Sequence, residues 1–164
     1  MSEFDETEEM DVAEELPEKP DYSFELDEEG RTTRANGSLV LGSGERDLAA
    51  QIEAGGEFRR DSDDGGHLIG ARFMGQGDPE NLIAQDAKLN RGGYKSLENV
   101  WADNLEQGKS VDVDIQPVYQ DVVTRPHAIM GNYTMTDAGG GEKTEYFSFT
   151  NENLESEEFE LPDE

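Results

Sequence analysis

The chain has 164 residues, of which 40 are acidic and 13 basic, so its formal charge is -27, and it contains no cysteine. The length suits a single domain with a modest core, and the lack of cysteine excludes disulfide bonds and thiolate metal sites. The acidic N-terminus lacks an apolar run, and no stretch approaches the roughly 20 apolar residues of a membrane span. We therefore expect neither a secretory signal peptide nor a membrane partner.

The negative charge is concentrated at the two ends of the chain. Residues 1–20 contain nine acids and one base, and residues 151–164 contain seven acids and no base. Segments of this composition bury too little apolar surface to offset the entropy lost on ordering. We predict acidic disordered tails at 1–20 and 151–164, on either side of a folded unit at 21–150.

In the first part of the folded unit, apolar residues recur at every second position, as they do in β-strands. Apolar and polar residues alternate over 22–26, and after a turn a second strand is expected over 31–41. Residues 49–54 fit either a helix or a strand.

A polar loop with two glycines, residues 61–66, precedes His67. Leu68, Ile69 and Phe73 predict a short apolar strand directly after the histidine. An imidazole with an ordinary pKa near ~6.5 is mostly neutral above pH 7 and can accept a proton from water. The alternative for a single histidine is a loop residue with no chemical role.

Helical periodicity begins further along the chain. Tyr94, Leu97, Trp101 and Leu105 recur at every third or fourth residue, which predicts an amphipathic helix whose apolar stripe docks on a sheet. Gly108 is well placed to end it. We therefore assign Tyr94 and Trp101 to the core rather than to a surface that stacks on nucleic-acid bases.

Asn90 and Glu98 are eight residues apart, so on one helix they share a face. The asparagine carbonyl is an oxygen ligand for a hard metal such as Mg²⁺. Together with His67, the pair can place a metal-bound water and a general base on either side of a phosphodiester. The alternatives are a helix N-cap for Asn90 and a solvated helix position for Glu98.

The remaining periodicity is that of strands. One is expected over 111–115, with Pro117 ending it or placing it at a sheet edge, and 129–136 and 142–150 predict a hairpin. The predicted class is α+β, an antiparallel sheet with one principal helix that carries the metal ligand.

Two stretches of the chain resemble one nuclease family. The first is DDGGHLIGARF around His67, and the second is GDPENLIAQDAKLNRGGYKSLENVW, which contains Asn81, Gln85, Asn90 and Glu98. Over roughly residues 22–150 the chain is similar to the DNA/RNA non-specific endonucleases of the ββα-metal (His-Me finger) superfamily, especially the toxin domains of bacterial effector proteins. Better-known secreted members carry Asp-Arg-Gly-His where this chain has Asp-Gly-Gly-His, so the arginine of that motif is absent. The resemblance implies the ββα-metal fold.

The same resemblance assigns roles to the motif residues. His67 is the general base, and Asn90 holds Mg²⁺, with Mn²⁺ as the alternative ion. The resemblance implies that Glu98 acts through a water of the metal's shell. Three further residues orient the site: Asn81, Gln85 and Asp64, which holds the loop that presents His67.

Arginines near the site are expected to bind phosphate through bidentate hydrogen bonds. Arg46, in the stretch GSGERD, is our choice for the catalytic arginine that the family carries upstream, and Arg60 and Arg91 are expected to bind substrate. Arg34 competes with them, and a surface ion pair is the alternative role for each arginine. His127 is expected to be structural or exposed.

These features predict a metal-dependent, sequence-non-specific endonuclease that hydrolyses phosphodiester bonds of DNA, RNA or both. As a toxin domain it would use a specialised secretion system and have a cognate immunity protein as partner. As a halophile nuclease it would act in the cytoplasm. The alternatives are an acidic nucleic-acid mimic that inhibits another protein, and a catalytically decayed nuclease kept as a scaffold.

The charge of the chain conflicts with a polyanionic substrate, because nucleases usually present basic grooves. Two explanations remain open. In a salty medium the repulsion is screened, since the Debye length is only ~3 Å at 1 M salt. Alternatively, the acidic tails lie over the site, or recruit a partner, and are displaced when the enzyme acts.

Overall fold

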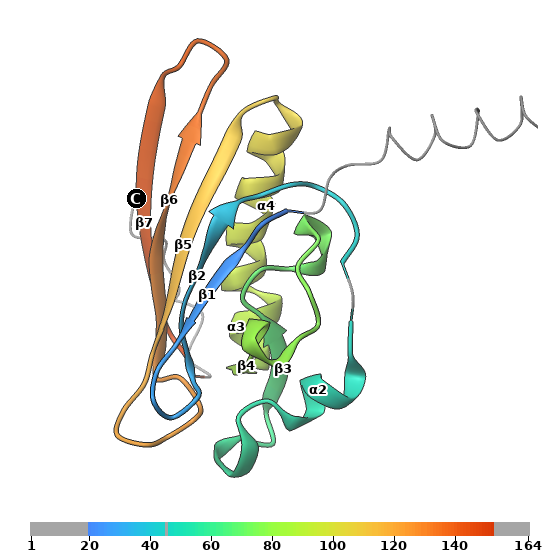
Figure 1. Ribbon diagram of the computed structural model, residues 1–164, viewed down its shortest axis with the longest axis vertical. Helices are drawn as coiled ribbons and strands as arrows, with labels where there is room; N and C mark the ends of the chain where they lie inside the picture. The colour runs from blue at the N-terminus through green and yellow to red at the C-terminus, as the bar shows by residue number, and fades with distance from the viewer. Residues whose placement is uncertain (1–19, 45, 153–164) are drawn as a thin grey trace, which may run out of the picture.

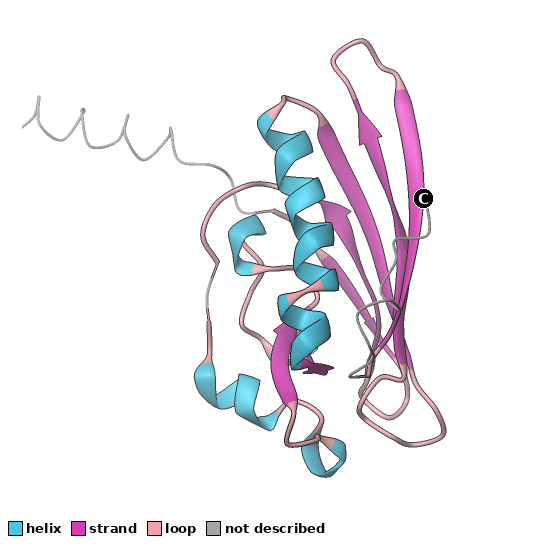
Figure 2. Cartoon of the chain, turned by 180° about the vertical axis from the view of Figure 1, so that it is seen from behind, coloured by secondary structure: helices cyan, strands magenta, loops and turns pink. Residues whose placement is uncertain are grey.

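The computed structural model describes residues 20–44 and 46–152. A five-stranded antiparallel sheet forms one layer, and helices and a two-stranded sheet lie on one side of it (Figures 1 and 2). The strands and helices in chain order are β1 (Ser23–Leu26), β2 (Thr32–Ser38), α2 (Leu48–Glu53), β3 (Asp63–His67), β4 (Leu82–Asp86), α3 (Ala87–Arg91), α4 (Gly93–Glu106), β5 (Ser110–Val118), β6 (Ala128–Thr136) and β7 (Glu142–Thr150). Short 3₁₀ turns cover Gly56–Phe58, Ala71–Phe73 and Pro79–Asn81.

The large sheet has the strand order β1-β2-β5-β6-β7, and β3 pairs with β4 in the smaller one. Val111, Val113 and Ile115 are buried on one face of β5, and the aspartates between them face away from the core. The strands expected near 22–26 and 31–41 and the hairpin of β6 and β7 are confirmed. The ambiguous segment 49–54 is helical.

Helix α4 lies along the covered face of the large sheet (Figure 2). Its buried side chains include Tyr94, Leu97 and Trp101, which confirms the apolar stripe. The Trp101 ring makes edge-to-face contacts with Phe73 and Tyr133, at centroid distances of 6.0 and 5.9 Å. Aromatic pairs of this kind add about 0.5–1.5 kcal/mol each to the free energy of burial. Trp101 therefore joins the helix, the sheet and the segment after β3 in one core.

The strand predicted after His67 is wrong. His67 is the last residue of a strand, β3, that includes the glycines assigned to a loop, and the chain then turns through a 3₁₀ helix at Ala71–Phe73. The cause lies in Asn81, whose side chain accepts a hydrogen bond from the Ile69 N–H at 3.0 Å and donates one to the Ile69 carbonyl at 2.9 Å. These bonds use the backbone groups that a strand would pair with a neighbour.

The single long helix expected from Asn90 is also wrong, because the helix is broken. The Asp86 side chain caps α3 by accepting hydrogen bonds from the Lys88 and Leu89 N–H groups. Gly92, at φ -117° and ψ -95°, then leaves the helical region before α4 begins. Asn90 therefore lies on the short helix α3, and Glu98 alone of the pair lies on the principal helix.

Pro117 does not end β5 or place it at the sheet edge. The strand occupies the middle of the sheet and continues to Val118. Its pairing with β2 stops at Ile115, while the pairing with β6 includes Pro117. Proline is tolerated here because β2 is not paired with β5 at this position and so needs no N–H from it.

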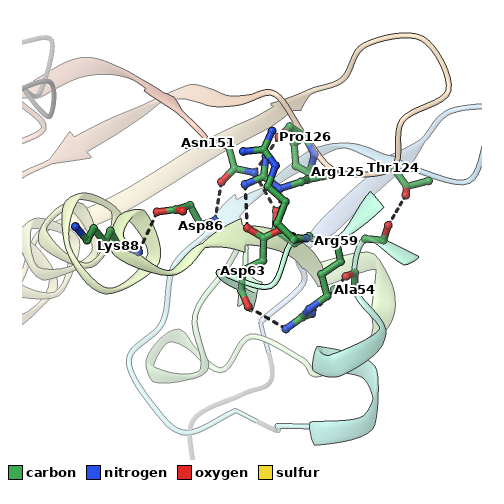
Figure 3. A network of polar contacts seen from close by, with 12 residues as sticks. Ala54, Arg59, Asp63, Asp86, Lys88, Thr124, Arg125, Pro126 and Asn151 are labelled. Atoms are coloured by element: carbon green, nitrogen blue, oxygen red, sulfur yellow. Dashed lines mark hydrogen bonds and ion pairs between the residues drawn. The ribbon is translucent and has the colours of Figure 1, made fainter. Parts of the chain in front are cut away.

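A buried network of polar side chains joins β3 to the segments just before β6 and just after β7 (Figure 3). The Arg125 guanidinium donates two hydrogen bonds to Asp63, at 2.7 and 2.9 Å, and the two side chains are only 5% and 0% exposed. Burial acts to raise the pKa of Asp63, but hydrogen bonds from the Arg125 side chain and the Arg60 N–H hold this pKa below its usual value.

Asn151 belongs to the same network and corrects the predicted boundary at residue 150. It is fully buried, accepts a hydrogen bond from the Asp86 N–H, and donates to the carbonyls of Ala84 and Pro126. The folded unit therefore includes Asn151. The predicted tails otherwise fall on residues 1–19 and 153–164, outside the described residues. Within residues 20–152, apart from residue 45, no helix is long and apolar enough to cross a membrane.

Replacing Arg125 by Met should lower the free energy of unfolding by about 3–5 kcal/mol, because the Asp63 carboxylate would remain buried without its partner. Urea titration of the full chain measures this change. The matched control is Arg34→Met, which removes the more exposed pair with Asp114 and should cost much less, because water screens an exposed ion pair. Equal losses in the two variants would contradict the structural role of the Asp63–Arg125 pair.

Candidate active site

One pocket of about 510 Å³ brings together the residues predicted to carry chemistry. His67 reaches it from the end of β3, Asn90 from α3, Glu98 from α4, and Arg46 from the segment before α2. Arg91 also lines it. A smaller pocket of about 290 Å³ shares Arg46 and Asn90 with it. His67, Asn90 and Glu98 thus line one pocket, although the helix predicted to carry both Asn90 and Glu98 is broken.

The two glycines before His67 set the spacing of this site. A Cβ atom on Gly66 would overlap Gln85 Oε1 and lie 3.1 Å from Asn90 Oδ1, and one on Gly65 would overlap the Gln51 carbonyl oxygen. At Gly65 only glycine allows the β3 backbone to lie this close to the backbone of α2, and at Gly66 an added Cβ would displace the Gln85 and Asn90 side chains. The close approach places His67 and Asn90 beside the same space.

Asp64 fixes the orientation of the Asn90 side chain. Its carboxylate accepts a hydrogen bond from Asn90 Nδ2 at 2.9 Å and a bidentate pair from the Arg91 guanidinium at 2.9 and 2.7 Å. An ionised carboxylate only accepts hydrogen bonds, so the amide nitrogen must face Asp64 and the carbonyl oxygen must point away from it. The sequence predicts that Asp64 holds a loop; in the structure it lies in β3 and holds α3.

Glu98 is half-buried and lines the same pocket. Burial raises its pKa to about 7, and the positive charges of Arg72, Lys95 and Arg46 act in the opposite direction. Its carboxylate lies against the chain at Gly70, where an added Cβ would come within 2.7 Å of Glu98 Oε2. Carboxyl groups whose pKa is shifted strongly from its usual value are found most often in functional sites.

The pocket is cationic although the chain is acidic. Four of its lining side chains are basic (Arg46, Arg72, Arg91 and Lys95), and Glu98 is its acidic one. A cleft lined by one sign of charge concentrates counter-ions of the opposite sign. The pocket therefore has a local positive potential that attracts anions, although the net charge of the whole chain is -27.

The other predicted residues fall into two groups. Asn81 and Gln85 are fully buried behind the site: Asn81 fixes the segment after His67, and the Gln85 amide has no hydrogen-bond partner within the described residues. Arg60 lies outside both pockets, and its N–H bonds to Asp63. Arg34 is paired with Asp114 in the sheet.

The sequence reasoning missed two cations of the pocket, Arg72 and Lys95. Lys95 precedes Glu98 by three residues, and this helical spacing could have identified it. Arg72 donates a hydrogen bond to Asn99 Oδ1 at 2.8 Å and reaches the pocket from a 3₁₀ turn that was predicted to be a strand. No sequence signal placed that arginine.

The donors of the pocket suit a hydrated hard cation. The Asn90 carbonyl and the Glu98 carboxylate are oxygen donors, and His67 is the imidazole nearby. Within the described part of the chain, no three His, Cys, Asp or Glu side chains cluster as a dedicated metal cage would require. Mg²⁺ keeps several waters and needs few protein ligands, so it fits this set, whereas a closed tetrahedral zinc site does not.

The raised pKa of Glu98 predicts a stability change that depends on pH. The folded protein holds this proton up to about pH 7, whereas an unfolded glutamate loses it near ~4.3. The stabilisation by the proton is therefore complete below the unfolded pKa and lost as the pH rises through 7. In EDTA, Glu98→Gln should raise the free energy of unfolding by about 2–3 kcal/mol at pH 8 and by less than about 1 kcal/mol at pH 5.

Urea titrations at the two pH values measure this difference. Glu106→Gln, an exposed acid on the same helix, is the matched control and should change stability by less than about 0.5 kcal/mol at either pH. A Glu98→Gln effect that is the same at pH 5 and pH 8 would refute the desolvated carboxylate.

Solved structures with a similar fold include proteins named as nucleases. The crystal structure of NucA from Streptococcus agalactiae with magnesium ion bound superimposes with a TM-score of 0.65 at 19% identity, covering 85% of this chain and 74% of NucA. The structure of Sda1 nuclease with bound zinc ion gives a TM-score of 0.60 at 15% identity, covering 88% of this chain and 82% of Sda1. These likenesses confirm the ββα-metal fold, formed here by β3, β4 and α3.

Two relatives are similar in sequence over part of their length. The type VII secretion system protein EssD of Staphylococcus aureus (strain USA300) is 36% identical over 112 residues, which cover 64% of this chain and 18% of EssD. The probable deoxyribonuclease RhsA of Dickeya dadantii (strain 3937) is 33% identical over 103 residues, covering 60% of this chain and 7% of RhsA. The chain thus matches less than a fifth of either relative.

The model of the DNA/RNA non-specific endonuclease family matches residues 11–136, which include every element from β1 to β5 and all the site residues discussed above. The chain belongs to the DNA/RNA non-specific endonuclease family.

Proposed function

We propose that the protein is a metal-dependent, sequence-non-specific endonuclease that hydrolyses phosphodiester bonds of DNA, RNA or both. The observation that carries the proposal is the convergence of His67, Asn90, Glu98 and Arg46 on one cationic pocket. A base, oxygen ligands for a metal and a phosphate-binding cation are the groups that this hydrolysis needs. Family membership and the nuclease folds of the structural neighbours support the same reaction.

Asn90 would hold a divalent cation, with Glu98 acting through a water molecule, and Mg²⁺ is our choice over Mn²⁺. When bound, the ion would polarise the phosphate and neutralise charge on the leaving oxygen. His67 would take the proton of the attacking water. Arg46 would bind a phosphate oxygen, and Asp64 would keep the Asn90 carbonyl turned to the site.

The lining of the pocket explains how an acidic chain can bind a polyanion. Arg46, Arg72 and Lys95 would contact phosphates, and such contacts position a nucleic acid without reading its bases. Arg91 would contribute less to substrate binding, since its guanidinium is paired with Asp64. This distribution supports cleavage without sequence preference.

The biological setting is also part of the proposal. EssD is named as a type VII secretion system protein and RhsA as a probable deoxyribonuclease, which supports an exported toxin domain guarded by an immunity protein. A nuclease of a salty cytoplasm is the alternative setting. The cationic pocket weighs against an acidic mimic, because a mimic would present negative charge at its functional surface.

Cleavage assays on plasmid DNA and on RNA test the activity. We expect cleavage with Mg²⁺ and none in EDTA, and we expect His67→Ala to lower the rate at least ~10²-fold, as for the loss of a general base. His127→Ala is the matched control, because His127 is exposed and lies outside the pocket, and it should keep full activity. Cleavage that survives EDTA or the loss of His67 would refute the proposal. A folded wild-type protein without activity would indicate the decayed scaffold.

The role of Asp64 predicts a specific defect in metal binding. Asp64→Asn supplies an amide that can bond to the Asn90 oxygen, which would turn that oxygen away from the site. We expect Mn²⁺ affinity, measured by calorimetry without substrate, to fall about 10–100-fold. Arg91→Met removes the ion pair but keeps the carboxylate, so its affinity should change less than about threefold. Equal losses in both variants would show that the ion pair, and not the acceptor, orients Asn90.

A further inference from the structure

A second, smaller pocket of about 290 Å³ adjoins the active-site pocket. The two pockets share four lining residues, Arg46, Gln51, Gly65 and Asn90. Since Asn90 is the proposed metal ligand, the reacting phosphate would lie where the two pockets meet. A polymer bound with one phosphate at Asn90 can therefore extend into the smaller pocket.

The smaller pocket is lined by two uncovered apolar side chains. Leu48 and Ile52, one turn apart on α2, are 73% and 68% exposed, and they are the most exposed large apolar side chains among the described residues. Single exposed leucines are common on protein surfaces, but adjacent apolar side chains that line a pocket indicate a binding site. The ligand of this pocket should therefore have an apolar surface of its own.

Helix α2 holds this pair in place although none of its six residues is buried. Six residues are too few for a stable isolated helix, and α2 lies beside β3, away from the large sheet (Figures 1 and 2). Polar bonds attach it: the Gln51 side chain donates to the Gly65 carbonyl at 3.0 Å, and the Arg59 guanidinium donates to the Gln51 carbonyl at 2.5 Å. The helix adds no side chain to the core, so its position favours a role at the pocket.

Arg59 brings a positive charge to the smaller pocket. Its guanidinium donates hydrogen bonds to three backbone carbonyls, those of Gln51, Ala54 and Asp63. It forms no ion pair within the described part of the chain. A guanidinium has five N–H groups, so two remain to bind an anion such as phosphate. Asp64, the acidic residue that lines this pocket, is already paired with Arg91 at 2.7 Å.

We propose that the smaller pocket binds the nucleotide next to the cleaved phosphodiester, with Arg59 on its phosphate and Leu48 and Ile52 against its base. The proposal rests on the proposed function, since it treats the larger pocket as the place of cleavage. A nucleotide combines an anionic phosphate with the apolar face of a base, and the pocket matches both. Aliphatic side chains read no pattern of hydrogen bonds, so this contact would accept any base.

The apolar contact should distinguish single strands from duplexes. In a duplex the faces of each base are covered by stacked neighbours, so Leu48 and Ile52 would reach a base only after it is unstacked, which costs free energy. A single strand of DNA or RNA exposes its bases at lower cost. The pocket should therefore favour an unpaired nucleotide of either kind.

Binding of a labelled strand of roughly 12 nucleotides, followed by fluorescence anisotropy in EDTA, tests the apolar contact without cleavage. Replacing Leu48 and Ile52 together by Gln keeps a good helix former at both positions. This double variant should bind the single strand at least ~fivefold more weakly than wild type, and the matching duplex less than ~twofold more weakly, on the scale of one stacking contact.

The matched control replaces Val122 and Met130 by Gln, because both are exposed apolar residues that lie outside the two pockets. It should bind the single strand and the duplex as wild type does. Equal losses for the two nucleic acids in the Leu48 and Ile52 variant would overturn the proposal. Unchanged binding in that variant would also overturn it, and would leave the apolar pair as a contact for a protein partner.

The salt dependence of binding tests the phosphate contact of Arg59. For a single strand, the plot of log binding constant against log salt concentration becomes shallower by about 0.7 for each phosphate contact that is lost. Arg59→Met should show this change. Arg60→Met is the matched control, because it removes the same charge from a neighbouring side chain outside both pockets, and it should keep the wild-type slope. Equal slopes in the two variants would overturn the contact.

The experiments are independent of one another and of the cleavage assay. Arg59 also bonds to three carbonyls, so the exposed Leu48 and Ile52 variant tests the pocket even if Arg59→Met does not fold. A protein that shows both binding effects but cleaves neither DNA nor RNA would refute the proposed function and leave the nucleotide pocket standing. A protein that cleaves nucleic acid but binds it equally well without Leu48 and Ile52 would refute the nucleotide pocket alone.

Discussion

The close packing of β3 against the α2 backbone and against the Gln85 and Asn90 side chains is the constraint on which the site depends. Gly65 and Gly66 leave no room for side chains between the strand and its neighbours. As a result His67, at the end of the strand, and Asn90, on the next helix, line one pocket. Asp64 completes the arrangement, because its carboxylate holds the asparagine amide and so directs the carbonyl oxygen. A larger residue at either glycine would require the neighbouring Gln51 backbone or the Gln85 and Asn90 side chains to move.

The rest of the fold holds this small unit in place from two ends. At one end Trp101 packs against Phe73 and Tyr133, which fixes the helix of Glu98 between the sheet and the segment after the histidine. At the other end the buried pair of Asp63 and Arg125 ties the first residue of β3 to the loop before β6. The site thus stands on rigid elements, and it concentrates basic side chains in a chain that is otherwise strongly acidic.

Most of the sheet and the buried stripe of α4 were predictable, since alternation and helical periodicity report on burial. The course of the backbone around the site could not be predicted from the sequence. Ile69 looked like a strand residue because its partner, the Asn81 side chain, lies twelve residues away. Asp86 caps a short helix that ends at Gly92, whose backbone leaves the helical region, so Asn90 fell on a different helix from the one expected. Asn151 looked like part of an acidic tail because its three partners are distant in sequence.

The central claim is that Asn90 directs an oxygen ligand into a pocket that also holds the proposed base, His67, and a half-buried carboxylate, Glu98. A crystal structure of the protein with Mn²⁺ tests it most directly, because the ion is located by its anomalous scattering. The account predicts an ion within bonding distance of Asn90 Oδ1, about 2.0–2.6 Å, inside the pocket lined by His67 and Glu98. An ion held by other acidic residues of the chain, with none at Asn90, would contradict it.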